Sequence, residues 1–94
     1  MLVIAQHTKI TDPKTFWEKA KMVVGNTPPG MSVRSVFPSQ DGKTGTCIWE
    51  AGSAEEVQKF LDNASEGLAT NFCYELNEAA AIGLPETKKE AALN

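Results

Sequence analysis

The chain has 94 residues, of which 41% are hydrophobic, and this length supports one domain with a single core. The net charge is −3 and the basic residues are not clustered, which argues against a nucleic-acid partner because such partners are held by grouped lysines and arginines. The first apolar run, Leu2 to Ala5, is too short for a membrane span or a signal-peptide core, so we expect no membrane partner and a cytoplasmic location. Cys47 and Cys73 lack zinc-site or CxxC spacing, so both are expected to be reduced thiols.

The N-terminal third predicts a strand followed by a helix. Residues 2–8 are rich in branched side chains and begin apolar on both faces, which is typical of a central strand. Asp12 is a preferred helix N-cap, Pro13 is tolerated at the first helical position, and a helical stripe of apolar residues follows. Gly25 then ends the helix, and a Pro-Pro-Gly sequence at 28–30 forms a rigid connection.

The middle of the chain predicts a hairpin. Asp41 and Gly42 together favour a two-residue type I′ turn, in which both central residues have positive φ. This turn pairs a strand at 33–38 with a strand at 44–51.

A second helix and a fourth strand follow. Ser53 is expected to cap the helix, with Glu56 reaching back to the Ser53 backbone N–H as in a capping box. Gly67 lies where the helix is expected to end. The kinds of side chain alternate along residues 71–77, as they do in a strand whose two faces differ, and this pattern predicts the fourth strand.

The element order is therefore β-α-β-β-α-β, the ferredoxin-like α+β arrangement, with a four-stranded antiparallel sheet and both helices on one face. We assign residues 1–85 to this single domain and residues 86–94 to a C-terminal tail. The face without helices also carries apolar side chains, and a monomer rarely leaves a large apolar patch in water. The pattern favours a second copy of the chain that packs its own sheet against this apolar face. The sequence therefore predicts a homodimer.

Four short strings carry a resemblance to known proteins. They are VRSV at 33–36, DGKT at 41–44, CIWEA at 47–51 and SAEEV at 53–57. Together they resemble the dimeric α/β-barrel superfamily of ferredoxin-like proteins, and are most similar to an uncharacterised subgroup that includes small nickel-binding bacterial proteins. The subgroup is richer in histidine after the second helix, whereas this chain has ASEGL at 64–68. The resemblance implies a homodimeric barrel that binds a small ligand or a divalent metal such as nickel.

His7 is the single histidine and the centre of the candidate metal site. In this arrangement the first strand lies between the third strand, taken as parallel to it, and the antiparallel fourth strand. These neighbours are expected to bring Glu50 and either Phe72 or Cys73 toward His7. Imidazole, carboxylate and thiolate are then candidate ligands for a metal, and a dimer can share the site. The alternative is a structural histidine, hydrogen-bonded at a strand end, with no site.

A candidate ligand-binding site involves Trp49, Arg34 and Tyr74. The predicted hairpin register places Arg34 opposite Trp49, where the two side chains can stack or line a cavity for an aromatic or anionic ligand. A register shift of one residue moves Arg34 to the other face of the sheet. The alternative is that these side chains serve packing. Cys47 is expected in the core, because no basic residue or helix N-terminus is placed to stabilise its thiolate.

Three functions remain open at this point. The first is a homodimeric barrel that binds a small ligand or divalent metal around His7, Glu50 and Trp49. The second is a cofactor-free monooxygenase of the antibiotic-biosynthesis type, acting on an aromatic substrate, which predicts an open and mostly apolar cavity. The third is a structural or interaction module with a closed core.

Overall fold

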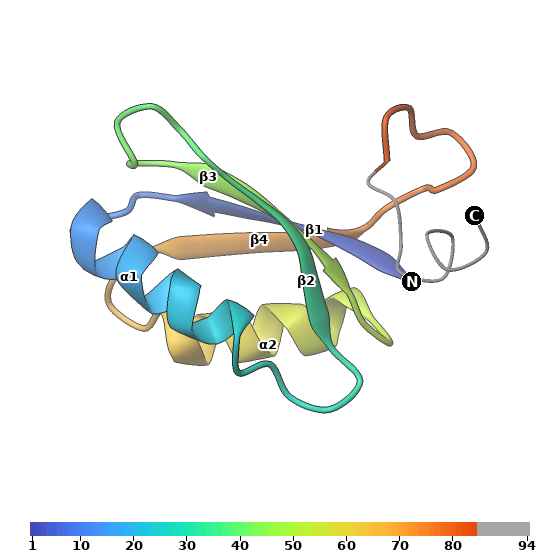
Figure 1. Cartoon of the computed structure of the whole chain (residues 1–94), viewed down its shortest axis with the longest axis horizontal. Helices are drawn as coiled ribbons and strands as arrows, with labels where there is room; N and C mark the ends of the chain where they lie inside the picture. Colours follow the sequence, from blue (N-terminus) through green and yellow to red (C-terminus); the bar gives the residue numbers. More distant parts are fainter. Residues whose placement is uncertain (85–94) are drawn as a thin grey trace.

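The computed structural model describes residues 1–84 and contains two helices and one four-stranded sheet (Figure 1). The predicted tail at 86–94 lies outside the described residues. In chain order the elements are β1 (Leu2–Thr8), α1 (Pro13–Val24), β2 (Ser32–Pro38), β3 (Gly45–Glu50), α2 (Ala54–Ala64) and β4 (Thr70–Glu75).

The strand order across the sheet is β2-β3-β1-β4, and every neighbouring pair is antiparallel. This is the ferredoxin-like α+β arrangement that the sequence predicted. The prediction that β1 is a central strand is confirmed, since it pairs with β3 on one side and β4 on the other.

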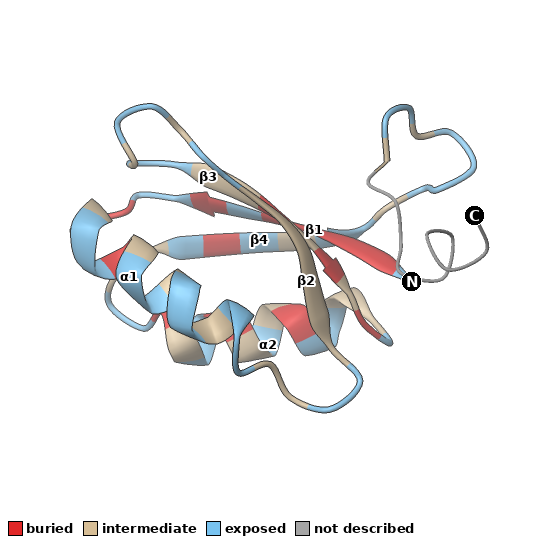
Figure 2. Cartoon of the chain, viewed as in Figure 1, coloured by how far each residue is buried: buried red, intermediate tan, exposed pale blue. Residues whose placement is uncertain are grey.

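The core lies between the sheet and the helices, where Figure 2 shows the buried residues in red. Successive strand residues point to opposite faces, so alternate residues of β1 and β3 face the helices. The buried core cluster consists of Val3, Ala5, Cys47, Trp49, Ala51, Val57 and Leu61. Helix α2 approaches β4 and β1 closely, whereas the backbone of α1 stands further from the sheet.

The start of each helix follows its predicted capping residue. The Asp12 carboxylate accepts from the Thr15 backbone N–H at 3.2 Å, and Pro13 is the first residue of α1. The Ser53 hydroxyl oxygen accepts from the Glu56 backbone N–H at 3.1 Å, which confirms the first half of the predicted capping box. Helix α2 is capped at its C-terminal end by Ser65, two residues before Gly67.

The prediction of a two-residue type I′ turn is wrong. Six residues separate β2 from β3, and of Asp41 and Gly42 only Gly42 has a positive φ, at 74°. The Asp41 carboxylate accepts from the Lys43 backbone N–H at 3.0 Å and from the Ser39 hydroxyl at 2.9 Å. These local hydrogen bonds favour a longer loop over the tight turn.

The predicted hairpin register is also wrong at Arg34. Val33, not Arg34, lies opposite Trp49, and an irregularity between Val33 and Ser35 leaves Arg34 out of the ladder. An extra residue of this kind is a β-bulge, which the sequence pattern does not signal.

Candidate functional site

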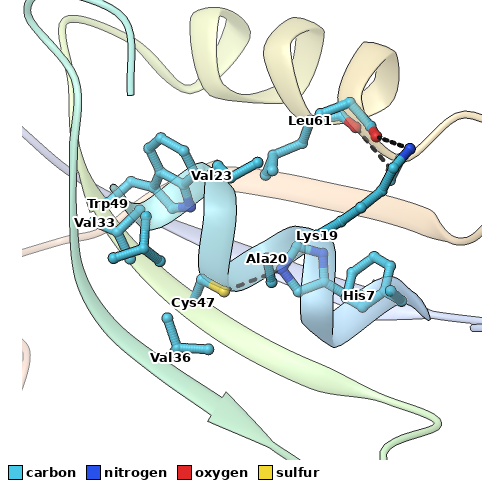
Figure 3. A pocket seen from close by; sticks show the side chains of 13 residues that line it. His7, Lys19, Ala20, Val23, Val33, Val36, Cys47, Trp49 and Leu61 are labelled. Atoms are coloured by element: carbon cyan, nitrogen blue, oxygen red, sulfur yellow. Dashed lines mark hydrogen bonds between the residues drawn. The ribbon is translucent and has the colours of Figure 1, made fainter. Parts of the chain in front are cut away.

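A partly enclosed cavity of about 40 Å³ lies between α1, α2 and the sheet (Figure 3). Most of its wall is apolar; it includes Ala20 and Val23 of α1, Val33 and Val36 of β2, and Leu61 of α2. Lys19 on α1 spans toward α2, where its ammonium donates to the Ala64 carbonyl oxygen at 3.4 Å. The cavity is therefore an apolar space with a single basic side chain at its rim.

Three side chains of the central strands bring polar atoms to this cavity. His7 lies near the end of β1, and Cys47 and Trp49 are alternate residues of β3, so all three project from the helix-covered face of the sheet. Each is buried. The Phe16 ring packs against the imidazole of His7 at an interplanar angle of 60°, with ring centroids 5.3 Å apart.

The indole of Trp49 carries a polar group without a partner. The side chain is 1% exposed, and its Nε1 forms no hydrogen bond with any described residue. The ring packs edge to face on Phe60, with centroids 5.7 Å apart. Leaving a buried N–H donor unsatisfied costs on the order of 1–3 kcal/mol, so any hydrogen-bond acceptor that reached this N–H would remove that cost.

A chain of hydrogen bonds links Cys47, His7 and Asn71. The Cys47 Sγ lies 3.2 Å from His7 Nε2, and His7 Nδ1 lies 2.7 Å from the Asn71 side-chain oxygen. The Asn71 amide nitrogen donates to the Ser65 hydroxyl oxygen at 2.7 Å and to the Asp62 carboxylate at 3.1 Å. The whole chain is held by β1, β3, β4 and the end of α2.

These partners determine the direction of each hydrogen bond. The Asp62 carboxylate only accepts, so the nitrogen of the Asn71 amide faces it and the oxygen faces His7. His7 Nδ1 must then carry the proton, which leaves Nε2 as an acceptor for the Cys47 thiol. The thiol proton therefore already points to a base.

Burial favours the neutral form of both His7 and Cys47. It lowers the pKa of His7 from its ordinary value, an effect that the hydrogen bond to Asn71 only partly offsets. Burial also raises the pKa of the Cys47 thiol to about 12 and that of Cys73 to about 11. The resting pair is therefore a thiol hydrogen-bonded to a neutral imidazole.

The predicted convergence of Glu50 with His7 is wrong, because β3 runs antiparallel to β1. His7 lies opposite Gly45, and Glu50 lies opposite Leu2, five residues and roughly 16 Å further along the strand. Asn71, rather than Phe72 or Cys73, lies opposite His7 on β4. Within residues 1–84 no group of three or more His, Cys, Asp or Glu side chains gathers as a metal site would require.

The predicted ligand-binding residues do not form one site. Arg34 forms an ion pair with Glu50, whose side chain alternates with that of Trp49 and so lies on the other face of the sheet. Tyr74 lies on that same open face beside Phe72, with ring centroids 5.8 Å apart. Of the three predicted residues, Trp49 alone lines the cavity.

Sequence reasoning did not single out Asn71 and Ser65. Asn71 could have been found from the antiparallel pairing of the first and fourth strands, because the register of that pairing places it opposite His7. Nothing in the sequence pattern marks Ser65, whose position depends on where α2 ends.

The fold and the cavity define a ferredoxin-like α+β domain with a buried thiol–imidazole pair under its first helix. None of the helices in the described part is long and apolar enough to cross a membrane. Residues 3–84 match a family model described as "Domain of unknown function (DUF8652)", and the chain belongs to this family. Neither the curated proteins nor the solved structures gave a match to the chain.

Proposed function

We propose that this protein binds a small, largely apolar molecule that carries one hydrogen-bond acceptor, in the cavity under α1. The observation that carries the proposal is the unpartnered Nε1–H of Trp49, which is buried in the wall of an apolar cavity. Ligand sites commonly combine apolar walls with a few polar groups that fix orientation. An acceptor placed on the ligand would satisfy this buried donor, which has no partner within residues 1–84.

The size of the cavity favours a short ligand. It measures about 40 Å³, whereas one water molecule needs roughly 10–15 Å³ of such accessible space and a cavity known to hold benzene measures about 150 Å³. An aromatic substrate for a monooxygenase would require α1 to move outward. Binding of a short aliphatic molecule needs a smaller rearrangement, and we therefore place it ahead of the monooxygenase alternative.

We do not extend the proposal to nickel. His7 has one thiol beside it, that of Cys47, and its other ring nitrogen is already bonded to Asn71. Borderline divalent metals favour several imidazole or thiolate ligands around one ion. The hydrogen-bond chain supplies too few free donor atoms for such a set.

We also propose that the protein forms a homodimer through the open face of the sheet. Phe37, Phe72 and Tyr74 lie on this face and are 58%, 60% and 39% exposed. Exposed aromatic side chains on one face of a sheet, here on both of its edge strands, are typical of an interaction surface. A second copy offers the same aromatic surface, so a two-fold arrangement pairs the two faces.

The ligand proposal is tested by following the two indole N–H resonances of the ¹⁵N-labelled protein during titration with butanone. We expect the Trp49 resonance to move in a saturable way, because its free N–H gains an acceptor. The Trp17 N–H already donates to the Gly42 carbonyl oxygen at 2.7 Å, so its resonance serves as an internal control. A hydrocarbon of similar size, 2-methyl-1-butene, provides the ligand control.

The Trp49→Phe variant keeps an aromatic ring but removes the N–H. We expect it to fold and to lose the preference for butanone over the hydrocarbon. A Trp49 resonance that no short carbonyl compound moves would contradict the proposed binding function.

A further inference from the structure

We propose that Cys47 and His7 capture a short aliphatic aldehyde as a reversible covalent adduct in the cavity under α1. This inference rests on the proposed function, because the aldehyde enters the same cavity and places its oxygen at Trp49. It goes further by assigning a chemical class to the ligand and a nucleophile to the site.

The arrangement of Cys47, His7 and Asn71 is that of an activated nucleophile. The thiol lies 3.2 Å from His7 Nε2, within reach for proton transfer, and the imidazole is oriented by Asn71 at 2.7 Å. Ser65 and Asp62 fix the Asn71 amide in turn. Asn71 is therefore a positioning residue, and Cys47 and His7 are the reacting pair.

A second, independent observation points to a carbonyl compound. The Nε1–H of Trp49 lies on the same face of β3 as Cys47, two residues along the strand, and has no acceptor among the described residues. A carbonyl oxygen is an acceptor, and the carbon bonded to it is the atom that a thiol attacks. One small functional group thus offers both an acceptor for the Trp49 N–H and an electrophile for the Cys47 thiol.

The addition balances without a further reactant. The Cys47 sulfur forms a bond to the aldehyde carbon while the π bond of the carbonyl breaks, and its electron pair moves to the oxygen. The thiol proton passes to His7 Nε2 and then to that oxygen, which gives a hemithioacetal and restores the neutral imidazole. The Trp49 N–H stabilises the negative charge that develops on the oxygen. No group leaves, and nothing is oxidised or reduced.

The thiol of Cys73 and the amine of Lys19 are the competing sites at which an aldehyde could react. Cys73 is more exposed than Cys47, but no imidazole is bonded to its sulfur in the described structure. Exposure alone therefore favours reaction at Cys73, whereas the geometry favours Cys47. Lys19 lies at the rim of the cavity, and its amine would give an imine instead of a hemithioacetal.

The test adds propanal labelled with ¹³C at the carbonyl to the 94-residue chain and follows the labelled carbon by NMR. We expect one saturable hemithioacetal resonance in the wild type and in Cys73→Ala, and its loss in Cys47→Ala. His7→Gln should slow adduct formation by about 100-fold or more, because the general base is removed. Circular dichroism checks that each variant folds.

The outcomes separate this inference from the binding function. An adduct on Cys73, or an imine that disappears in Lys19→Ala, overturns the inference. Movement of the Trp49 indole resonance by butanone without any hemithioacetal from propanal also overturns it, while the binding function stands. If neither compound affects the protein, both proposals fail.

Discussion

His7 is the single histidine of the chain and is 2% exposed. Burial lowers its pKa because a charged imidazolium would lose its hydration in the core. The unfolded chain therefore binds a proton more readily than the folded chain does. It follows that the free energy of unfolding is highest above the ordinary histidine pKa of about 6.5, and falls as the pH drops from there toward the lower pKa of the folded state.

We predict that wild-type protein loses stability between pH 7.5 and pH 5.5, measured by urea denaturation at several pH values. His7→Gln should be less stable at pH 7.5, since it disturbs the hydrogen-bond chain to Cys47 and Asn71. Its stability should nevertheless change less across this pH range, because no other side chain of the protein ordinarily titrates there. Parallel pH profiles for the two proteins would show that His7 is not responsible.

Gly45 occupies a position where the space above the backbone is already filled. It lies opposite His7, and a Cβ built on it would overlap the six-membered ring of Trp17. We predict that Gly45→Ala lowers the free energy of unfolding by about 1–3 kcal/mol, the range for overpacked sites. Gly25→Ala is the matched control, since its Cβ would meet no atom closer than 3.8 Å. Equal denaturation midpoints for the two variants would contradict this prediction.

Among the helices and strands, the sequence predicts best those bounds that depend only on neighbouring residues. The bounds of β1 and the first residue of α1 follow from branched residues and from the Asp12-Pro13 cap, which need no tertiary contact. The hairpin loop was mispredicted because the Asp41 carboxylate binds the neighbouring backbone. The Arg34 bulge was missed because it depends on how two strands meet.

The candidate site was predicted less well than the fold. The choice of His7 and Trp49 agrees with the residues that line the cavity, but Glu50 was placed beside His7 by an error in strand direction. Cys47 was correctly expected in the core, yet the role we propose for it depends on a hydrogen bond to a residue 40 positions away. Contacts of that separation follow from the register of the sheet and not from sequence spacing.

Helix α1 stands further from the sheet than α2 does, and its capping therefore matters more for its stability. We predict that amide hydrogens of α1 exchange faster than those of α2. Asp12→Ala should speed exchange in α1 further while leaving α2 unchanged, because it removes the acceptor for the Thr15 backbone N–H. The comparison variant is Ser53→Ala, which removes the equivalent cap of α2. Exchange that rises equally in both helices of Asp12→Ala would count against an independently opening α1.

For the whole molecule, the open face of the sheet is the surface on which association is expected. We predict that Phe72→Glu converts a dimer into a monomer, because it places a carboxylate among the aromatic side chains of that face. Met22→Glu is the control, since Met22 is 68% exposed but belongs to α1. Sedimentation equilibrium gives the mass of each protein. A monomeric wild type, or a dimer that Met22→Glu also dissociates, would refute dimerisation through the sheet.

The bulge at Arg34 has a consequence for aggregation through the edge of the sheet. Strand β2 forms one edge of the sheet, where unpaired backbone groups offer a template for a strand from another molecule. The extra residue breaks the regular spacing of those groups, and the ion pair of Arg34 with Glu50 places charged side chains beside the break. Strand-by-strand growth of the kind that leads to fibres is thereby discouraged at this edge.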